Sequence, residues 1–184
     1  MSEKKILKGI KVAILVTDGF EEIELTAPLE ELEEYGATVH IISEKTRVRS
    51  WKKREWGSEF NTDRSIETAQ WDEYDILILP GGVINTDRLR RNSDAIKIIK
   101  DFDNKAKLIA AICHGPQLLI EAGLVKGRNM TCHRAIATDM KNAGADYEDY
   151  GLLVDANFIT ARGAEDVSAF LKKIIGILKV QNQY

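Results

Sequence analysis

Two cysteines and two of the three histidines stand side by side in this chain of 184 residues, as Cys113-His114 and Cys132-His133. A thiolate is a strong nucleophile, and an imidazole takes up or returns protons near neutral pH. Cys113 directly follows the apolar run Lys107–Ile112 and precedes a helical stretch, which is typical of a nucleophile elbow. A thiol at the first turn of a helix also meets the positive end of the helix dipole, which predicts a lowered pKa for Cys113.

The same residues also have plainer interpretations. Free cysteine is among the most buried residue types, so Cys113 is alternatively a core residue, and this interpretation is favoured for Cys132 inside the expected strand Met130–Cys132. Adjacent strand residues point to opposite faces, so neither Cys-His dipeptide readily gives two ligands to one metal ion, and we expect no metal site. His40, inside another expected strand, is interpreted as structural. No glycine-rich nucleotide-binding motif occurs, so we expect no nucleotide cofactor.

Carboxylates and glycines follow two other apolar runs. They are Glu21, Glu22 and Glu24 in one loop and Gly81 and Gly82 in another. An acidic loop is often solvated surface, but one carboxylate that faces Cys113 would share a proton with its thiol, since two adjacent negative charges cannot both form freely. That carboxyl group would be a general acid and base with a raised pKa. The N–H groups of Gly81, Gly82 and His114 would form an oxyanion hole, although Pro-Gly-Gly also occurs in simple turns.

Apolar runs that alternate with amphipathic stretches predict an α/β fold with a mostly parallel sheet and helices on both faces. The carboxyl ends of parallel strands meet at one edge, so we expect the three motifs to lie together. The region from Thr46 to Thr62 is expected to be a hairpin or an excursion at the sheet edge. The expected strands are Lys11–Thr17, Thr38–Ser43, Asp75–Leu79, Lys107–Ile112, Met130–Cys132, Leu152–Asp155 and Asn157–Ala161. The expected helices are Thr26–Tyr35, capped by Thr26 with Pro28 in its first turn, and Ser93–Asn104, Gly115–Gly123, Ile136–Ala143 and Glu165–Val180.

The composition indicates a globular protein, because 44% hydrophobic residues in a chain of this length suffice for a core. The net charge of −3 gives no global field for nucleic acid or an anionic membrane, and we expect neither as a partner. No apolar run approaches the ~18 residues of a membrane-spanning helix, and the first residues lack the apolar stretch of a signal peptide. Two cysteines are too few for a disulfide framework, so a cytoplasmic location with free thiols is expected.

The segment Ala110–Gly127, and AICHGPQ within it above all, resembles the nucleophile region of the ThiJ/PfpI family, and of its PfpI-like branch most. Further matching segments are Phe20–Leu25, Leu79–Gly82, Asp139–Gly144, Leu153–Asp155 and Thr160–Arg162. The resemblance runs from about Lys11 to Leu178 and implies one domain over residues 1–184. It implies a flavodoxin-like sheet, related to that of class I glutamine amidotransferases, and an activity without a cofactor.

The resemblance also implies roles for particular residues. Cys113 corresponds to the reactive cysteine and Glu24 to its partner carboxylate, and Glu21 matches the other glutamate of the family pattern. His114 matches the histidine that PfpI-like members place after the nucleophile. His133 falls where the Parkinson's-associated branch has a histidine near its cysteine.

The resemblance further implies a homo-oligomer, from dimer to hexamer. Some PfpI-like oligomers take a third acidic residue from a neighbouring subunit, just after the Gly-Gly pair, and Asp87 is the nearest candidate here. The stretch around Trp51 and Trp56 departs from the glycine-containing hairpin of the family. Exposed aromatic residues are enriched at interfaces, so these two residues are expected either at a subunit contact or folded back on their own domain.

Three functions are compatible with these residues. The first is an enzyme acting on reactive carbonyls or their adducts, of glyoxalase or deglycase type, in which the Cys113 thiolate attacks carbon and Glu24 moves protons. The second is a cysteine peptidase that uses Cys113, His114 and an acid from another subunit, although adjacent residues are awkwardly placed for a nucleophile–base contact. The third is a non-catalytic redox sensor or chaperone whose Cys113 is oxidised to a sulfinate.

Overall fold

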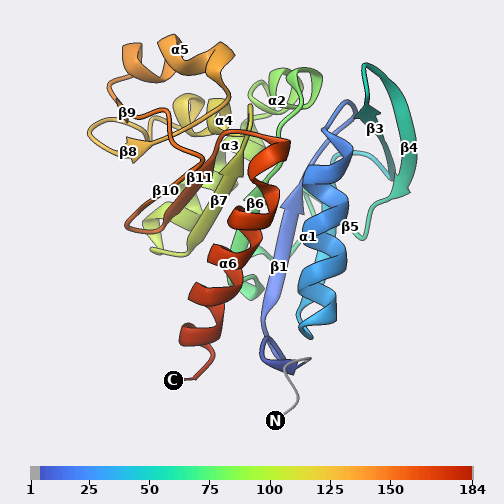
Figure 1. The fold of residues 1–184 in the computed structure, drawn as a ribbon. Coiled ribbons are helices and arrows are strands. Elements are labelled where there is room, and N and C mark those ends of the chain that lie inside the picture. Colours follow the sequence, from blue (N-terminus) through green and yellow to red (C-terminus); the bar gives the residue numbers. More distant parts are fainter. Residues whose placement is uncertain (1–4, 184) are drawn as a thin grey trace.

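Residues 5–183 are described by the computed structural model, which centres on a seven-stranded sheet in the order β10-β11-β7-β6-β1-β2-β5 (Figure 1). All neighbouring strands in it run parallel except β10 and β11. The strands are β1 (Lys11–Leu15), β2 (Thr38–Ser43), β5 (Arg64–Ser65), β6 (Ile76–Leu79), β7 (Leu108–Ile112), β10 (Leu152–Asp155) and β11 (Phe158–Ala161). The apolar runs of the sequence therefore predicted these strands to within two residues at each end, except β5, which was not expected.

Helices cover both faces of this sheet, as expected for an α/β fold. Alternate residues of β1 point to opposite faces, so Val12 and Ile14 pack in one core with α1 and α6, while Ala13 and Leu15 pack in the other with α3 and α4. The helices are α1 (Glu22–Glu34), α2 (Val83–Leu89), α3 (Ser93–Asn104), α4 (Pro116–Glu121), α5 (Ala137–Asn142) and α6 (Val167–Gln181), with short 3₁₀ turns η2 (Trp71–Glu73), η3 (Arg134–Ile136) and η4 (Ala164–Asp166). The mostly parallel, flavodoxin-like sheet is confirmed.

Two helix predictions were wrong. The first helix begins at Glu22, not at Thr26, and Pro28 lies buried inside it. An acidic residue in the first turn favours this earlier start, because the ionised Glu22 meets the positive end of the helix dipole. The second error is α2, which at seven residues is too short to show a helical hydrophobic period and was not expected.

The region after β2 forms an antiparallel hairpin of β3 (Arg47–Lys52) and β4 (Glu55–Asn61), separate from the main sheet. It docks on the loop after β1 through backbone contacts: the Gly19 N–H donates to the Arg49 carbonyl (2.8 Å), and the Trp51 N–H donates to the Phe20 carbonyl (2.7 Å). The expected hairpin is thus confirmed, and it stands beside the carboxyl end of β1 (Figure 1).

The last part of the chain adds a small parallel pair, β8 (Asn129–Met130) and β9 (Asp146–Tyr147), above the edge of the main sheet. Cys132 lies in the buried segment after β8, not within a strand as expected.

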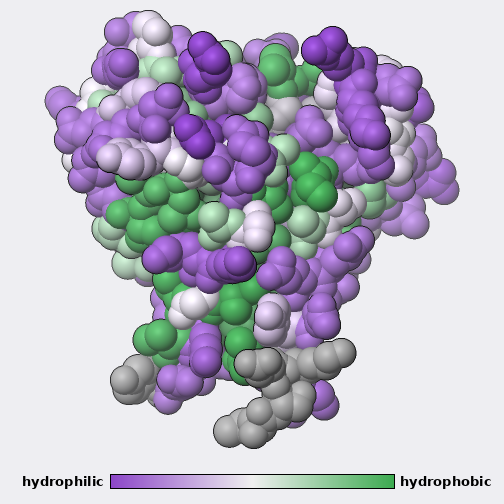
Figure 2. All heavy atoms as spheres, viewed as in Figure 1, coloured by the Kyte–Doolittle hydropathy of each residue, from purple (hydrophilic) through white to green (hydrophobic). Residues whose placement is uncertain are grey.

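The side of the molecule formed by β10 and α6 shows hydrophobic residues at its surface (Figure 2), among them Val154 and Val180. None of the helices within residues 5–183 has the length and apolar character needed to cross a membrane.

Candidate active site

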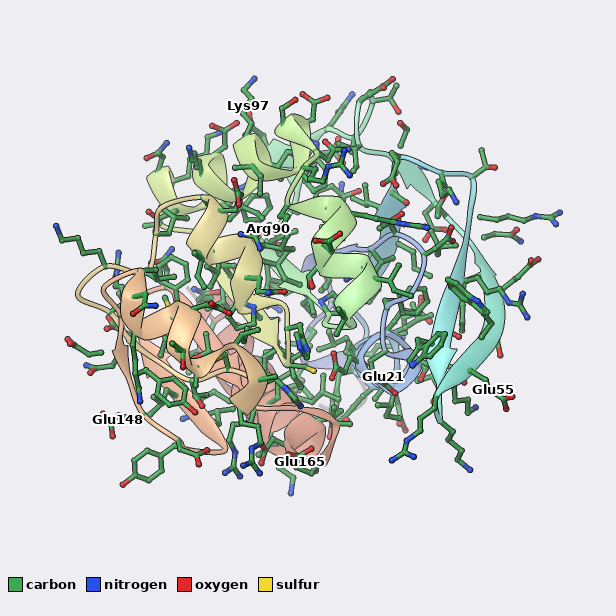
Figure 3. The ribbon with its side chains drawn as sticks, turned by 90° about the horizontal axis from the view of Figure 1, so that it is seen from above. Glu21, Glu55, Arg90, Lys97, Glu148 and Glu165 are labelled. Carbon is green, nitrogen blue, oxygen red and sulfur yellow. The ribbon has the colours of Figure 1, made fainter. Side chains whose placement is uncertain are left out.

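The carboxyl ends of β1, β6 and β7 converge on a pocket of about 390 Å³, as the sheet topology predicted. Figure 3 looks down on this end of the sheet. The residues that line the pocket are Gly19, Glu21, Trp51, Gly82, Val83, Ile84, Cys113, His114 and His133. Five chain segments far apart in sequence therefore contribute to one site.

Cys113 occupies a sharp turn between β7 and α4, with a φ of 63°. The turn is closed by hydrogen bonds from the Cys113 N–H to the Ala161 carbonyl (3.0 Å) and from the Gly115 N–H to the Ile112 carbonyl (2.8 Å). A Cβ atom at position 115 would lie 2.2 Å from the Leu79 carbonyl oxygen, so only glycine fits there. The turn leaves Cys113 partly exposed at the pocket floor.

Glu24 extends from the first turn of α1 into the space beside Cys113 and is 1% exposed. Its Oε2 atom accepts a hydrogen bond from the Gly81 N–H (2.6 Å), whereas Oε1 is buried and has no hydrogen-bond partner among residues 5–183. Burial raises the pKa of Glu24 to about 8, and the Gly81 hydrogen bond opposes that shift. The structure thus brings together the carboxyl group and the thiol that the sequence suggested would share a proton.

The pKa of the Cys113 thiol is shifted in the opposite direction to the predicted one. Burial and the nearby Glu24 carboxylate raise the pKa of Cys113, while the N–H groups of Gly82 and His114 favour the thiolate and lower it. The expected lowering by the helix dipole was therefore wrong, because burial and a facing carboxylate outweigh it. Since Glu24 and Cys113 lie side by side and both have raised pKa values, their titrations are coupled, and the first ionisation is a property of the pair.

The two glycines after β6 allow the loops to approach closely. A Cβ atom on Gly81 would lie 2.6 Å from the Cys113 Cβ and 2.9 Å from the Glu24 Oε2. Gly82 has a φ of +90°, and a Cβ there would lie 2.2 Å from the Gly19 carbonyl oxygen. The expected set of oxyanion donors needs one change, because the Gly81 N–H already binds Glu24. The N–H groups of Gly82 and His114 are the ones directed at the sulfur.

The two histidines of the Cys-His pairs stack on each other, with ring centroids 4.5 Å apart and an interplanar angle of 24°. The Nδ1 atom of His114 lies 3.3 Å from the Cys113 sulfur. This contact was not expected, because adjacent residues are awkwardly placed for a nucleophile–base contact. Burial and the neighbouring His133 lower the pKa of His114 to about 4. His133 Nδ1 accepts a hydrogen bond from the Ala135 N–H, so a neutral His133 carries its proton on Nε2. His40 contacts the Tyr74 hydroxyl (2.8 Å) away from the site, in keeping with a structural role.

Glu21 and Glu22 have separate environments. Glu21 is half-buried in the pocket wall, and burial together with Glu22 raises its pKa. Glu22 points to the hairpin, where it accepts hydrogen bonds from Ser50 Oγ (2.6 Å) and the Ser58 N–H (3.1 Å) and pairs with Lys52. These contacts, Lys52 first, lower the pKa of Glu22 to about 2. Glu22 thus fastens β3 and β4 to the site, a function that its sequence position did not reveal.

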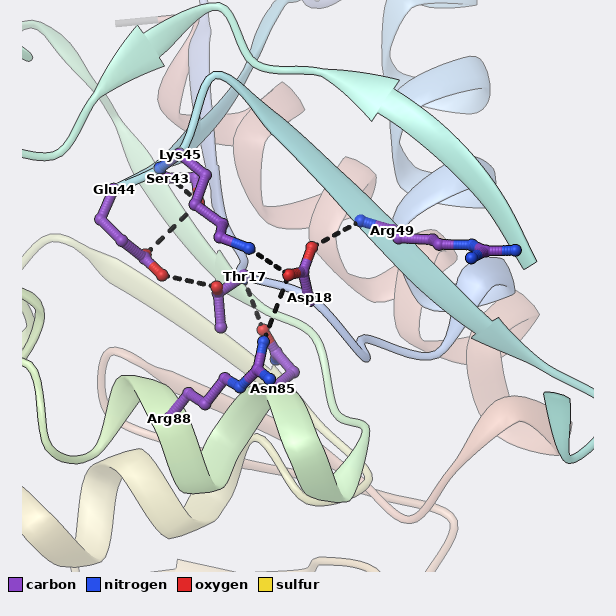
Figure 4. Close-up of polar contacts among 8 residues, drawn as sticks. All are labelled: Thr17, Asp18, Ser43, Glu44, Lys45, Arg49, Asn85 and Arg88. Atoms are coloured by element: carbon purple, nitrogen blue, oxygen red, sulfur yellow. Dashed lines mark hydrogen bonds and ion pairs between the residues drawn. The ribbon is translucent and has the colours of Figure 1, made fainter. Parts of the chain in front are cut away.

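Asn85 is a second residue that sequence reasoning missed. Its fully buried amide accepts a hydrogen bond from the Thr17 N–H (2.8 Å) and donates to the carbonyls of Pro80 and Gly81 (both 3.0 Å). The network around Thr17 and Asp18 at the ends of β1 and β2 is drawn in Figure 4. Asn85 therefore fixes the Gly81-Gly82 loop, whose N–H groups face Glu24 and Cys113. Its only sequence signal was a polar residue just after the Gly-Gly pair.

Asp87 is exposed on α2 and does not line this pocket. Within the chain as described, no carboxylate is hydrogen-bonded to His114, so one subunit does not complete a Cys-His-acid triad.

Cys132 is fully buried, and burial raises its pKa to about 12. Residues 5–183 contain no group of three or more His, Cys, Asp or Glu side chains placed to hold a metal ion.

Comparisons with known proteins agree with this geometry. The DJ-1/PfpI family matches residues 10–176. Protein/nucleic acid deglycase 2 of Escherichia coli is 38% identical over 169 residues, which cover 91% of this chain and 97% of that protein. Bacillus subtilis YraA, provisionally named a cysteine protease, is 37% identical over 169 residues, covering 92% and 98% of the two chains. A crystal structure from Anabaena variabilis, with DJ-1/ThiJ/PfpI-like and ferritin-like domains, has a TM-score of 0.86 and 36% identity; the match covers 92% of this chain and 48% of that one.

Proposed function

Since this chain belongs to the DJ-1/PfpI family, we propose that it is a cysteine-dependent enzyme that acts on reactive carbonyls or their adducts. The observation that carries the proposal is the buried pair of Cys113 and Glu24, in which a carboxyl group with a pKa of about 8 stands beside a thiol. A group that titrates near neutral pH both accepts and returns protons efficiently. The deglycase name of the Escherichia coli relative supports the same substrate class.

The proposed reaction on methylglyoxal begins when the Cys113 sulfur bonds to the aldehyde carbon and the thiol proton passes to Glu24 Oε1. The N–H groups of Gly82 and His114 stabilise the negative oxygen. Glu24 gives this proton to the negative oxygen, which completes a hemithioacetal, and as a carboxylate it then takes the proton from the reacting carbon and delivers it to the neighbouring carbon. The hydroxyl proton of the hemithioacetal passes to the oxygen of that neighbouring carbon, which leaves a thioester on Cys113. Water cleaves the thioester to give lactate and restores the thiol, so one aldehyde and one water yield one hydroxy acid without an oxidant.

The remaining pocket residues have supporting roles in this proposal. His114 is neutral at neutral pH, since its pKa is about 4, and it orients the thiol as a hydrogen-bond partner. His133 stacks on it and presents an Nε2–H group. Glu21 is the second acid of the pocket wall. No cofactor takes part in these steps.

The test is lactate formation from methylglyoxal by purified wild type, Cys113→Ala and Cys132→Ala, with a glycated peptide and an unmodified peptide in the same panel. Wild type and Cys132→Ala should turn over methylglyoxal or release free amine from the glycated peptide, while Cys113→Ala should do neither. Loss of activity in Cys132→Ala but not in Cys113→Ala would show that the wrong thiol has been assigned. Turnover of neither substrate by wild type would refute the proposal.

The alternative is an intracellular cysteine peptidase. The 3.3 Å contact between the Cys113 sulfur and His114 Nδ1 favours it, as does the name of the Bacillus subtilis relative. The peptidase hypothesis needs an acidic residue from a neighbouring subunit to complete the triad with Cys113 and His114, and the candidate is Asp87, which is exposed on α2. Cleavage of an unmodified peptide that is lost in Asp87→Ala would support it; a fully active Asp87→Ala oligomer would exclude that triad.

For the protein as a whole we propose a single domain over residues 1–184 that assembles as a homo-oligomer in the cytoplasm. The exposed acid on α2 and the exposed Trp56 near the pocket support assembly beside the site. Light scattering at micromolar concentration tests it, and a monomer under those conditions would contradict it.

A further inference from the structure

One wall of the Cys113 pocket is apolar and has no part in the proposed proton transfers. Trp51 from β3 and Val83 and Ile84 from the start of α2 form it. A three-carbon aldehyde with five heavy atoms fills roughly 150 Å³, at the ~30 Å³ that each water molecule takes in the liquid. The pocket holds about 390 Å³, so more than half of it stays free beside such a substrate. A reactive carbonyl with a larger apolar substituent therefore also fits in this pocket, with the substituent against the apolar wall.

Trp51 is held firmly in this wall. Its N–H donates to the Phe20 carbonyl (2.7 Å), and it forms an isolated parallel bridge with Glu21. Glu22 binds both neighbouring positions of the strand, Ser50 and Lys52. Trp51 and its two neighbours on the strand are thus held by residues 20–22, which lead into α1, the helix that carries Glu24.

The side chain of Trp51 is fixed as well. Trp56, its partner across the hairpin, packs edge to face against it, with centroids 5.5 Å apart and an interplanar angle of 82°. The guanidinium of Arg49 lies over the Trp56 ring at 5.9 Å. Trp56 is 41% exposed and does not line the pocket, so it supports Trp51 from outside. A rigid aromatic wall is suited to binding planar groups, because rings prefer edge-to-face or offset stacking with one another.

We propose that Trp51 is a specificity-determining residue that makes the pocket prefer carbonyl compounds bearing a planar ring on the carbon beside the reacting carbon. This inference rests on the proposed function for its substrate class, since it takes Cys113 as the group that meets the carbonyl compound. The preference arises from contact between the ring and the Trp51 wall while the reacting carbon lies at the Cys113 sulfur. Val83 and Ile84 complete the apolar surroundings of the ring.

The test compares the rates at which 2-bromoacetophenone and bromoacetone alkylate Cys113, followed by mass spectrometry of the Cys113 peptide. In both reagents the sulfur bonds to the bromine-bearing carbon, bromide leaves and the thiol proton goes to solvent, so the reagents differ in the ring alone. Free cysteine gives the intrinsic rate ratio. In wild type we expect the ring-bearing reagent to be favoured over that ratio by about two- to tenfold, the effect of one aromatic pair.

The variants then assign the preference to one residue. Trp51→Leu should lose it, Trp51→Phe should keep most of it, and the matched control Trp56→Ala should lose less than Trp51→Leu. A wild-type ratio equal to that of free cysteine, or an unchanged ratio in Trp51→Leu that folds normally by circular dichroism, would overturn the inference. The assay needs no turnover, so a ring preference in a protein that converts no aldehyde would leave the role of Trp51 intact and refute the proposed function alone.

Discussion

Replacing Glu24 by Gln should change how the stability of the protein depends on pH. The pKa of Glu24 rises from 4.5 in a free side chain to about 8 in the fold, so the folded protein binds this proton more tightly than the unfolded chain does. Its ionisation therefore costs nothing below pH 4.5 and destabilises the fold progressively up to about pH 8. The loss is roughly 1.4 kcal/mol per pH unit, or about 3 kcal/mol between about pH 5.5 and about pH 7.5. Gln cannot ionise, so Glu24→Gln should lack this loss.

Urea unfolding of both proteins at the two pH values measures the difference. Other titrating groups cancel in the comparison: burial lowers the pKa of His114 to about 4 in both proteins, and the raised pKa of Cys113 keeps its thiol protonated over this range. Relative to wild type, Glu24→Gln should gain about 3 kcal/mol of unfolding free energy as the pH rises. An equal pH dependence for the two proteins would show that Glu24 ionises normally, and the shared-proton pair would be wrong.

Three further predictions concern the surroundings of this pair. Gly81→Ala should destabilise the fold by about 1–3 kcal/mol and abolish turnover, because its Cβ would lie 2.6 Å from the Cys113 Cβ; wild-type stability by urea unfolding would contradict the close approach. Asn85→Ala should cost about 3 kcal/mol, since it leaves three buried backbone groups unpaired, and should lower lactate formation; a variant with normal turnover would show that the amide does not position the glycine loop. Iodoacetamide should alkylate Cys113 more slowly than free cysteine near neutral pH, because the raised pKa of its thiol leaves little thiolate, and should label the fully buried Cys132 more slowly still; equal labelling in peptide mass spectra would contradict the burial of Cys132.

Much of the site could be predicted because its residues follow strands. Cys113 and the Gly81-Gly82 pair follow the ends of β7 and β6, and Glu24 lies in the first turn of the helix that follows β1. Parallel strands that share a sheet must bring their carboxyl ends together. The continuous apolar runs located those strands to within two residues. The convergence of the three motifs therefore followed from local pattern and topology alone.

The rest depended on contacts between distant segments. The role of Glu22 requires the hairpin residues Ser50 and Ser58, which lie 28 and 36 positions away, and no local pattern marks such a pairing. The pKa of Cys113 was predicted with the wrong sign, since the helix N-terminus is visible in the sequence whereas the depth of burial is not. The contact with His114 was missed for a related reason: the positive φ at Cys113 turns the two adjacent side chains toward each other.

The most direct measurement of whether Cys113 and Glu24 act as one unit is the methylglyoxal turnover of the double variant Cys113→Ala/Glu24→Gln beside the two single variants. Residues that act together give strongly non-additive losses, because removing either one already disables the step that needs both. We expect Glu24→Gln to lose at least about 100-fold, as removal of a general base does, and all three variants to reach the same residual rate. A Glu24→Gln variant that retains most of its turnover, or a double variant whose loss is the product of the two single losses, would contradict the shared role of the pair.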